Sequence, residues 1–320
     1  MVGSHCVSLV DRSENEKKVA CDAAADFASI ARYRNTGEQE KRISSTPSQS
    51  PKPRLAASSY LNTAPLIWSF LQGSRQKMVQ LVTDTAPARC ADLLASGEVE
   101  AALVPIIEYQ RMPDVRVVPG VCVGSHSAVR SVVLVSKYDD LKNVRRVALD
   151  SSSRTSQTLV KIIFREFLET EPNWEITSPD IHAMLEDNDA ALLIGDPAMN
   201  VRLPHVHVFD LASLWRRFTD TGFVFAMWMA RAGAIAGISE VDFAGARDEG
   251  LKEVEQIISQ YENLSLPRAE IRKYLTKNIT FHLDEELERG MLLYFGLAGK
   301  HGLIEDNKPI RFMNSFDQTM

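Results

Sequence analysis

The sequence predicts an α/β fold of two lobes, each built on a mixed, mainly parallel sheet, with a ligand cleft between them. From Arg54 onward, short apolar runs typical of strands alternate with runs of helical period, and a second unit of this kind begins at Arg146. Polar turns follow several of the expected strands, and open α/β sheets place their ligand sites at such strand ends.

The first unit is expected to hold two helices between its strands. The first helix begins near Pro65, because proline lacks the N–H that would stay unpaired in a first turn anyway. The turn before this helix is expected to present Asn62 and Thr63 beside the free N–H groups of the helix start, which is an anion-binding geometry. The second begins at Thr85-Ala-Pro87 and ends at Gly97, with its apolar residues on one face. The expected strands are residues 55–59, 79–83, 101–105, 116–123 and 131–136.

The second unit opens with a strand at residues 146–149, a polar turn, and a helix at residues 157–168 whose apolar residues recur with a helical period. Further buried strands are expected at residues 190–194 and 223–229, and the chain beyond about Leu251 reads as helical.

The chain should divide into three parts. Residues 1–52 end in a proline-rich, polar linker and are expected to be a flexible N-terminal extension. Residues 53–134 and 226–320 form lobe 1, and residues 135–225 form lobe 2. The apolar runs 131–136 and 223–229 are the candidates to cross between them. This hinge arrangement is that of a type 2 periplasmic-binding-protein-like fold, which closes around a ligand.

Composition excludes several classes of function. The 320 residues carry a formal net charge of −6, so the global basic excess typical of nucleic-acid binding is missing. Four cysteines without a CxxC spacing disfavour a disulfide framework or a zinc site, and no run approaches the roughly 18–20 apolar residues of a membrane helix. Without a secretory h-region, a cytoplasmic location is expected. The GxGxxG, GxxxxGK[ST], HExxH and GxSxG motifs do not occur.

Three polar turns supply the candidate binding residues. The candidates are Ser59, Asn62 and Thr63 in the first turn, Ser152, Arg154, Thr155 and Ser156 in the second, and Gly195 and Asp196 in the third. Hydroxyls before a helix can donate to a carboxylate beside the helix N-terminus, although Ser and Thr there are usually just N-caps. Asp196 could bind a substrate hydroxyl or cap a helix, and Arg154 could pair with a carboxylate or point to solvent.

Histidines offer weaker signals. His126, in the connection Gly124-Ser-His-Ser-Ala-Val-Arg-Ser131, could act as a general base, although a histidine in a loop usually has no such role. The pair His205-x-His207 has no acidic or thiolate neighbours in sequence, so metal binding there is disfavoured and no metal or other cofactor is expected.

Three motifs resemble those of the chorismate dehydratase family of the futalosine route to menaquinone. They are Ser58-Ser-Tyr-Leu-Asn-Thr-Ala-Pro-Leu66, Asp150-Ser-Ser-Ser-Arg-Thr-Ser156 and Ala190-Ala-Leu-Leu-Ile-Gly-Asp-Pro-Ala198, in the expected order within about residues 54–300. The sister enzyme dihydroxynaphthoate synthase has different N-terminal motifs and a catalytic histidine, so the Asn62 turn argues against it.

The resemblance implies a cofactor-free lyase that converts chorismate, a dicarboxylate, into 3-[(1-carboxyvinyl)oxy]benzoate with loss of water. The family's functional asparagine falls on Asn62, and its serine falls on Ser131 within Val129-Arg-Ser131, with Ser125 as the alternative register. An amide cannot act as a base. The hypothesis is therefore that the enolpyruvyl carboxylate of the substrate, held by Asn62, takes the ring proton, while Ser131 hydrogen-bonds a substrate group or the departing hydroxyl.

Two other functions remain open at this point. A non-catalytic cytosolic protein could use the same fold to bind a small aromatic or cyclic carboxylate. Alternatively, the chain could be a subunit of an assembly with residues 1–52 as its docking arm, and its oligomeric state is left open.

Overall fold

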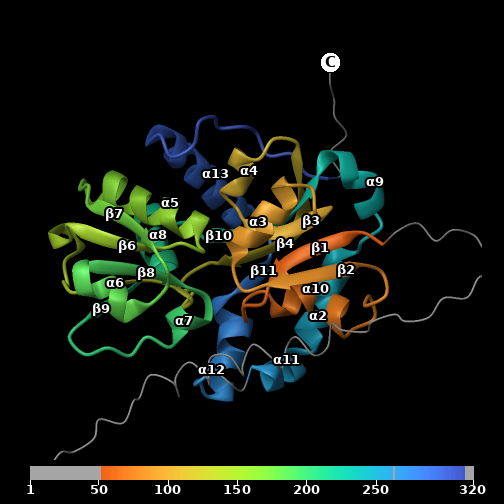
Figure 1. Cartoon of the computed structure of the whole chain (residues 1–320), viewed down its shortest axis with the longest axis horizontal. Coiled ribbons are helices and arrows are strands. Elements are labelled where there is room, and N and C mark those ends of the chain that lie inside the picture. Colours follow the sequence, from red (N-terminus) through yellow and green to blue (C-terminus); the bar gives the residue numbers. More distant parts are fainter. Residues whose placement is uncertain (1–51, 262–263, 314–320) are drawn as a thin grey trace, which may run out of the picture. The chain divides into compact units, whose positions relative to one another are not determined.

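The computed structural model describes residues 52–261 and 264–313, which belong to one compact unit, Pro51–Met320 (Figure 1). The predicted N-terminal extension, residues 1–52, lies outside the described residues apart from Lys52. It therefore stays a prediction.

Two sheets form two lobes within this unit, as the sequence predicts. Lobe 1 carries a six-stranded sheet in the order β11-β4-β10-β3-β1-β2, and lobe 2 a five-stranded sheet in the order β7-β6-β8-β5-β9 (Figure 1). The strands of lobe 1 are β1 (Arg54–Ser58), β2 (Gln80–Asp84), β3 (Ala101–Pro105), β4 (Val115–Ser125), β10 (Phe223–Arg231) and β11 (Thr280–His282). Those of lobe 2 are β5 (Val132–Ser136), β6 (Arg146–Asp150), β7 (Asn173–Thr177), β8 (Ala190–Ile194) and β9 (His207–Asp210).

The sheets are mixed, as predicted, but the prediction that most strand pairs are parallel is wrong. β1 pairs parallel with β2 and β3, and β6 pairs parallel with β7 and β8. β10 pairs antiparallel with β3 and β4, and β5 pairs antiparallel with β8 and β9. The reason is the crossing of the chain. β10 and β5 are the first strands after the chain crosses between the lobes, so each of them runs away from the cleft. β3 and β8 run toward the cleft, and the pairs β10–β3 and β5–β8 are therefore antiparallel.

The expected crossing strands each stay in one sheet. β5 pairs only within lobe 2, and β10 pairs only within lobe 1, among the strands that the structure describes. The predicted lobe limits, 134/135 and 225/226, therefore fall inside β5 and β10. We propose that residues 126–131 and 220–222, which lie between the sheets in the chain, are the crossing segments.

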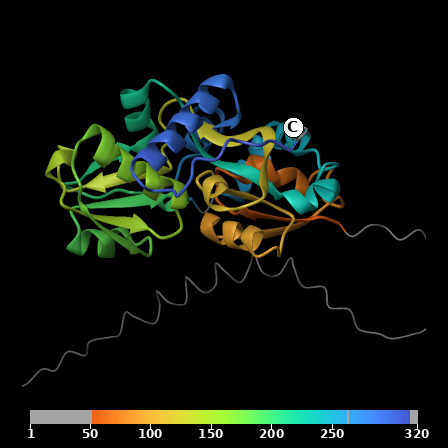
Figure 2. The ribbon, with the colours of Figure 1, turned by 90° about the horizontal axis from the view of Figure 1, so that it is seen from above.

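Helices cover both sheets, and some of them, α13 included, contact elements of both lobes. α13 packs against β10 of lobe 1 and α5 of lobe 2 (Figure 2). The α-helices are α2 (Ala64–Leu71), α3 (Pro87–Ala95), α4 (Glu108–Arg111), α5 (Arg154–Ile162), α6 (Ile181–Asp187), α7 (Gly195–Met199), α8 (Leu211–Thr219), α9 (Ile235–Ile238), α10 (Phe243–Lys252), α11 (Val254–Gln260), α12 (Arg268–Lys273) and α13 (Glu285–Lys300). Short π-helical turns at Ile163–Phe167 and Tyr274–Asn278 extend α5 and α12.

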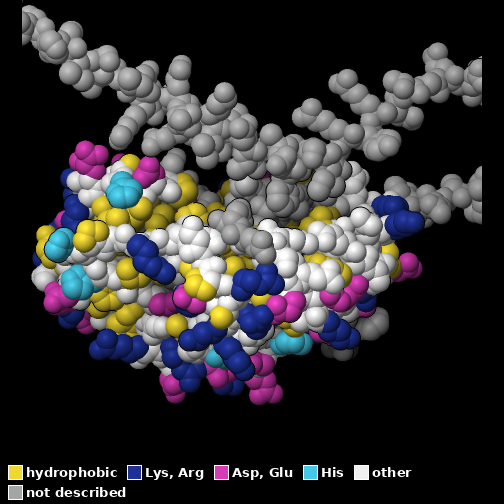
Figure 3. Space-filling model, turned by 90° about the horizontal axis from the view of Figure 1, so that it is seen from below, with side chains coloured by type: hydrophobic (Ala, Val, Ile, Leu, Met, Phe, Trp, Pro, Cys, Tyr) yellow, Lys and Arg dark blue, Asp and Glu magenta, His cyan; other side chains and the backbone are white. Residues whose placement is uncertain are grey.

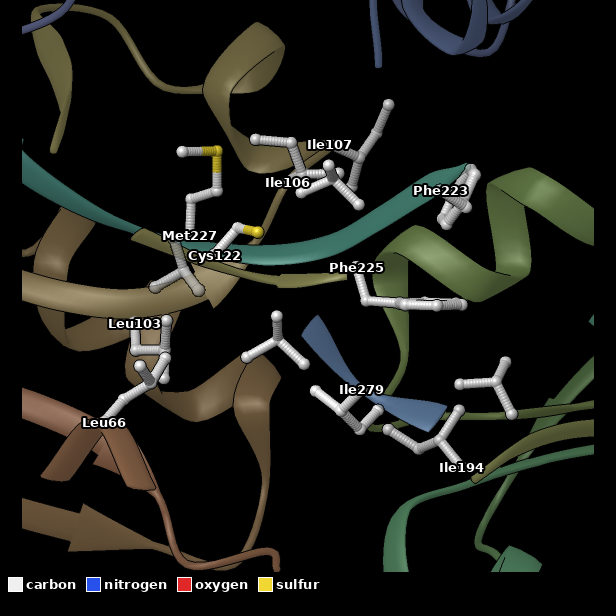
Figure 4. Close-up of a cluster of buried hydrophobic side chains, with 14 of the residues drawn as sticks. Leu66, Leu103, Ile106, Ile107, Cys122, Ile194, Phe223, Phe225, Met227 and Ile279 are labelled. Atoms are coloured by element: carbon white, nitrogen blue, oxygen red, sulfur yellow. The ribbon is translucent and has the colours of Figure 1, made fainter. Parts of the chain in front are cut away.

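The apolar core continues from one lobe into the other behind the cleft. Figure 4 shows Phe225 extending from β10 toward Ile194 at the end of β8, with Ile279 close by. Phe225 and Ile194 are 7% and 8% exposed, and both belong to the main cluster of buried apolar side chains. The strand ends of the two lobes thus meet over an apolar base.

The surface mixes charges of both signs. On the visible part of the face in Figure 3, lysine and arginine side chains lie beside aspartate and glutamate rather than in one basic field. Among the described residues, no helix combines the length and the apolar character needed to cross a membrane.

Gly250 fixes the position of the helix that follows the first polar turn. It lies in α10 where a Cβ atom would overlap the backbone carbonyl of Pro65, in the first turn of α2. Gly250→Ala should therefore lower the free energy of unfolding by about 1–3 kcal/mol, as overpacking does elsewhere. Denaturant unfolding measures this. Gly296→Ala, on the exposed face of α13 with no atom near its Cβ, should instead stabilise the protein by about 0.5–1 kcal/mol. Equal effects of the two substitutions would contradict the close approach of α10 to α2.

Candidate active site

A cavity lies where the polar turns of the two lobes meet. Lobe 1 contributes the end of β1 and the turn before α2, and lobe 2 contributes the turns between β6 and α5 and between β8 and α7. Its polar lining consists of Ser58, Tyr60, Asn62, Thr63, Ser152, Ser153, Thr155, Ser156 and Gly195, and its apolar lining of Pro87, Leu103, Pro105, Val123, Val132, Ile194, Phe225 and Ala226. Predicted residues from all three turns are therefore brought together.

The first turn differs from the expected anion site. The Thr63 hydroxyl donates to the carbonyl oxygens of Ser58 at 2.6 Å and Tyr60 at 2.8 Å, so it closes the turn. The backbone N–H groups of Thr63 and Ala64 are bonded to Tyr60 and Leu61. The expectation of free N–H groups at the start of α2 is therefore wrong, because this turn uses them itself.

Asn62 remains the polar side chain of this turn that needs a partner. It lines the cavity, and its Oδ1 is buried without a hydrogen-bond partner among the described residues. An unpaired buried polar atom costs about 1–3 kcal/mol, so its presence in a cavity calls for a ligand or water to complete it. The Asn62 amide can contribute both a donor and an acceptor to such a ligand.

The second turn is not used up in capping its helix. Ser153 is the N-cap of α5, yet its side chain makes no capping hydrogen bond. Ser153 and Ser156 both line the cavity and have no side-chain partner among the described residues, whereas Thr155 Oγ1 accepts from the Ile107 N–H of lobe 1 at 3.3 Å. Free hydroxyls beside a helix N-terminus form a binding site suited to a carboxylate.

Ser152 is already engaged by a buried carboxylate. Asp150, which is 0% exposed, accepts from the Ser152 N–H at 2.9 Å and from its hydroxyl at 2.6 Å, while its other oxygen accepts from the Ile194 N–H at 3.2 Å. Burial raises the pKa of Asp150, and the donors from Ser152 and Ile194 oppose that rise. The orientation of the Ser152 hydroxyl is therefore set from behind the cavity.

Gly195 meets Tyr60 across the cleft. Gly195 opens α7 with φ of +67°, and a Cβ on it would lie 2.7 Å from the Tyr60 ring. A side chain here would be strained by the backbone and would also collide with the tyrosine of the opposite lobe. This close packing holds Tyr60 over the cavity.

Two predicted binding residues instead join the lobes. Asp196 Oδ1 accepts from the Leu61 N–H of lobe 1 at 3.2 Å, so it neither caps α7 nor lines the cavity. Arg154 pairs with Asp92 at 2.7 Å and with the buried Glu108 at 3.2 Å, both in lobe 1. For Asp196 neither alternative weighed from the sequence describes this contact. For Arg154 the structure shows pairing with a carboxylate, but the carboxylates are those of Asp92 and Glu108 in the protein itself.

The position of Asp196 predicts a pH effect on stability. Burial is the main cause that raises its pKa to about 6, against 3.8 for a free side chain, and the Leu61 N–H opposes the rise. The folded state therefore holds this proton more tightly than the unfolded state, and stability from Asp196 falls as pH rises from about 4 to 6. The unfolding free energy of Asp196→Asn minus that of the parent protein should therefore increase over this pH range and stay constant at higher pH.

Unfolding in denaturant at a series of pH values measures this difference in unfolding free energy between Asp196→Asn and the parent protein. Glu249→Gln gives a control of opposite sign. Hydrogen bonds from Ser69 and Ser74 lower the Glu249 pKa to about 2, so this carboxylate stabilises the protein above the unfolded pKa. If the difference in unfolding free energy between Asp196→Asn and the parent protein did not change with pH, the raised pKa of Asp196 would be contradicted.

The structure does not bring Ser131 or Ser59 into the cavity lining. Ser131 is 0% exposed, its Oγ accepts from the Tyr274 hydroxyl at 2.7 Å, and its carbonyl accepts from the Gly195 N–H at 2.8 Å. Ser59 uses its carbonyl to accept from the Tyr261 hydroxyl at 2.9 Å. Ser125, the alternative register, is also buried and bonds within its own turn.

The histidines in the part of the chain that the structure describes lie outside the cavity lining. His126 contacts Asp284 at 3.1 Å and Glu286 at 3.3 Å near the start of α13. Within the described ranges, no group of three or more histidine, cysteine or acidic side chains is arranged to hold a metal ion.

The space inside the cavity is small. Its volume is about 50 Å³. A water molecule needs at least ~10–15 Å³ on this scale, so there is room for only a few of them. The contacts of Arg154, Thr155, Gly195 and Asp196 with lobe 1 hold the two lobes together around this small space. A ring-bearing ligand can enter only after the lobes move apart.

Sequence reasoning missed Ser58, Tyr60, Ser153 and Phe225 as cavity residues. Ser58, Tyr60 and Ser153 belong to the polar turns predicted from the sequence, but the sequence does not indicate that their side chains point into the cavity. Phe225 lies in a predicted buried strand, and no pattern indicates that this strand also forms the base of a cavity.

Comparisons with known protein sequences identify the family of this chain. A family model described as menaquinone biosynthesis matches residues 53–300. The chorismate dehydratase of Thermus thermophilus is 30% identical over 266 residues, which cover 75% of this chain and 93% of that protein.

Solved structures show the fold. The Candida albicans CA3427 gene product, described as having the generic periplasmic binding protein fold, superposes with a TM-score of 0.55 at 14% identity, over 84% of this chain and 99% of its own. The aliphatic sulphonate binding protein SsuA of Escherichia coli gives 0.54 at 16% identity, over 85% and 97%. The two-lobed fold is thus periplasmic-binding-protein-like, and by its family match and its curated relative this chain belongs to the menaquinone biosynthesis family.

Proposed function

We propose that this chain is a chorismate dehydratase, a carbon-oxygen lyase that removes water from chorismate to give 3-[(1-carboxyvinyl)oxy]benzoate. One observation carries the proposal: the turn residues that resemble that family converge on a single cavity, in a chain 30% identical to a chorismate dehydratase. The place in the futalosine route to menaquinone, the absence of a cofactor requirement and the cytoplasmic location belong to the same proposal.

The lining suits a substrate with two carboxylates. Ser153 and Ser156 at the N-terminus of α5 can donate to one of them, and the Asn62 amide from the opposite lobe can donate to the other. The cavity lining holds no lysine or arginine side chain. Binding then relies on hydroxyls, amides and the α5 dipole, which orient an anion within a water-excluding site.

The elimination balances without an added reagent. The C–H bond at the ether-bearing ring carbon breaks, its proton passes to the enolpyruvyl carboxylate, and its electron pair forms the new ring double bond. Hydroxide leaves the adjacent carbon, and the proton and hydroxide together make one water. Because the ring becomes aromatic, the protein has mainly to orient the carboxylate against the C–H bond. Asn62 is the residue we assign to that task.

Ser131 has a more indirect role in this proposal. Its carbonyl binds the Gly195 N–H and its hydroxyl accepts from Tyr274, so it lies directly behind the third turn of the site. These contacts support Ser131 as a positioning residue for Gly195 rather than as a group that touches the substrate.

Incubation of the purified full chain with chorismate, followed by mass spectrometry and proton NMR, tests the function. The expected product is lighter than chorismate by one water and has an aromatic ring with an intact enolpyruvyl ether. If folded protein binds chorismate but returns it unchanged, the chain is instead a binding protein for such carboxylates.

A further inference from the structure

We infer that Ser152 and Tyr60 together bind the ring hydroxyl of the substrate, with Ser152 accepting its proton and Tyr60 donating to its oxygen. This inference rests on the proposed function and assigns a group of the substrate that the two carboxylate sites leave unrecognised. It also revises the expected role of Ser152, which the sequence predicts as part of a carboxylate site.

Asp150 determines what Ser152 can offer to a ligand. A serine hydroxyl has one proton to donate and lone pairs with which to accept. Here the proton is directed to Asp150 Oδ1 at 2.6 Å, and the Ser152 N–H points to the same oxygen at 2.9 Å. Asp150 is fully buried at the end of β6, so solvent does not compete for these bonds. Only the lone pairs of Ser152 Oγ remain for the cavity.

A hydroxyl without a free proton is unsuitable for a carboxylate. Lone pairs facing a carboxylate oxygen would repel it, and Asp150 directly behind adds to that repulsion when ionised. A group that donates a hydrogen bond is what this position can bind. Ser153 and Ser156, by contrast, keep their protons free, so the two kinds of recognition are separated within one turn.

Tyr60 supplies the complementary donor from the opposite lobe. Its ring is held against Gly195, and the side chains of Tyr60 and Ser152 line the same cavity. Burial is the main cause that raises the Tyr60 pKa to about 12, and the charges of Asp150 and Asp196 add to it, so the phenol stays protonated at neutral pH. One donor and one acceptor facing each other match the two hydrogen-bonding functions of an alcohol.

This pair would sense whether the reaction has occurred. The ring hydroxyl is the group that leaves, so the product keeps both carboxylates but no longer has the group that Ser152 and Tyr60 bind. The contacts that span the lobes through this hydroxyl are then lost together with it. Substrate recognition and product recognition should therefore respond differently to the same substitution.

Steady-state kinetics with Ser152→Ala test the inference. The kcat/KM for chorismate should fall about tenfold, the value of one neutral hydrogen bond of roughly 1.4 kcal/mol, while the inhibition constant of the benzoate product stays unchanged. Tyr60→Phe, which keeps the ring and removes the donor, should give the same pattern. It also keeps the test decisive if Ser152→Ala disturbs folding around Asp150.

Ser156→Ala is the matched control from the same turn, because a carboxylate donor serves substrate and product alike. Ser156→Ala should lower kcat/KM for chorismate and weaken inhibition by the benzoate product to a similar extent. If Ser152→Ala or Tyr60→Phe weakens product inhibition as much as it lowers kcat/KM, the residue binds a carboxylate and the inference is wrong. An unmodified protein that produces no product from chorismate would instead overturn the proposed function.

Discussion

Asn62→Asp should lower kcat/KM for chorismate by about 10²–10³-fold, the usual effect of removing one pre-oriented polar group from an active site. The side chains have the same shape, so the change is electronic. The amide donor is lost, and a negative charge appears in a cavity that must hold a dianion. Asn62 Oδ1 is already buried without a described partner, so the site offers the new charge no compensating donor. Steady-state kinetics of product formation measure the effect.

The control for Asn62→Asp is Asn173→Asp, the same chemical change on the exposed strand β7 of lobe 2. It should leave kcat/KM and the melting temperature nearly unchanged. An Asn62→Asp enzyme that is as active as the parent protein would show that this amide does not hold the reacting carboxylate.

Gly195→Ala should lower kcat/KM by about 10²-fold, because a misplacement on the order of 1 Å near the reacting groups has an effect of that size. The new methyl group would lie 2.7 Å from the Tyr60 ring, so the lobes could not close as they do here. The cavity would then stay open to water with its two halves out of register. Kinetics together with the melting temperature separate this loss from a loss of folded protein.

Two further variants isolate the contact with Tyr60. Gly120→Ala introduces the same backbone strain at φ of +71°, but no atom lies within 4 Å of its Cβ, so it should lower stability without lowering kcat/KM. In a Tyr60→Ala background, the collision is gone, and Gly195→Ala should have a much smaller effect than in the parent protein. An equal effect in both backgrounds would place the cause in the backbone of Gly195 rather than in lobe closure.

The sequence was sufficient to predict the two lobes and the turns that form the site. Residues 101–105 and 190–194 are continuous apolar runs, and they form the fully buried strands β3 and β8. The edge strands β7 and β9 had no such signal, since most of their side chains are partly or fully exposed and their pattern resembles that of a loop.

The roles within the turns were harder to predict than their location. Serines 152, 153 and 156 look equivalent in sequence, yet one is bound to Asp150 while the other two are free. The difference depends on where the buried carboxylate at the end of β6 points, which no local pattern determines. Arg154 and Asp196 likewise acquire their partners only when lobe 1 approaches, and such long-range contacts are invisible to periodicity.

The most direct measurement is the number of product molecules formed per molecule of the purified full chain when chorismate is in excess. A chorismate dehydratase converts many equivalents into the carboxyvinyl ether of hydroxybenzoate, and Asn62→Asp at the same concentration converts far fewer. Chorismate that remains intact in the presence of folded, binding-competent protein would contradict the enzymatic function and leave a carboxylate-binding protein of the same fold.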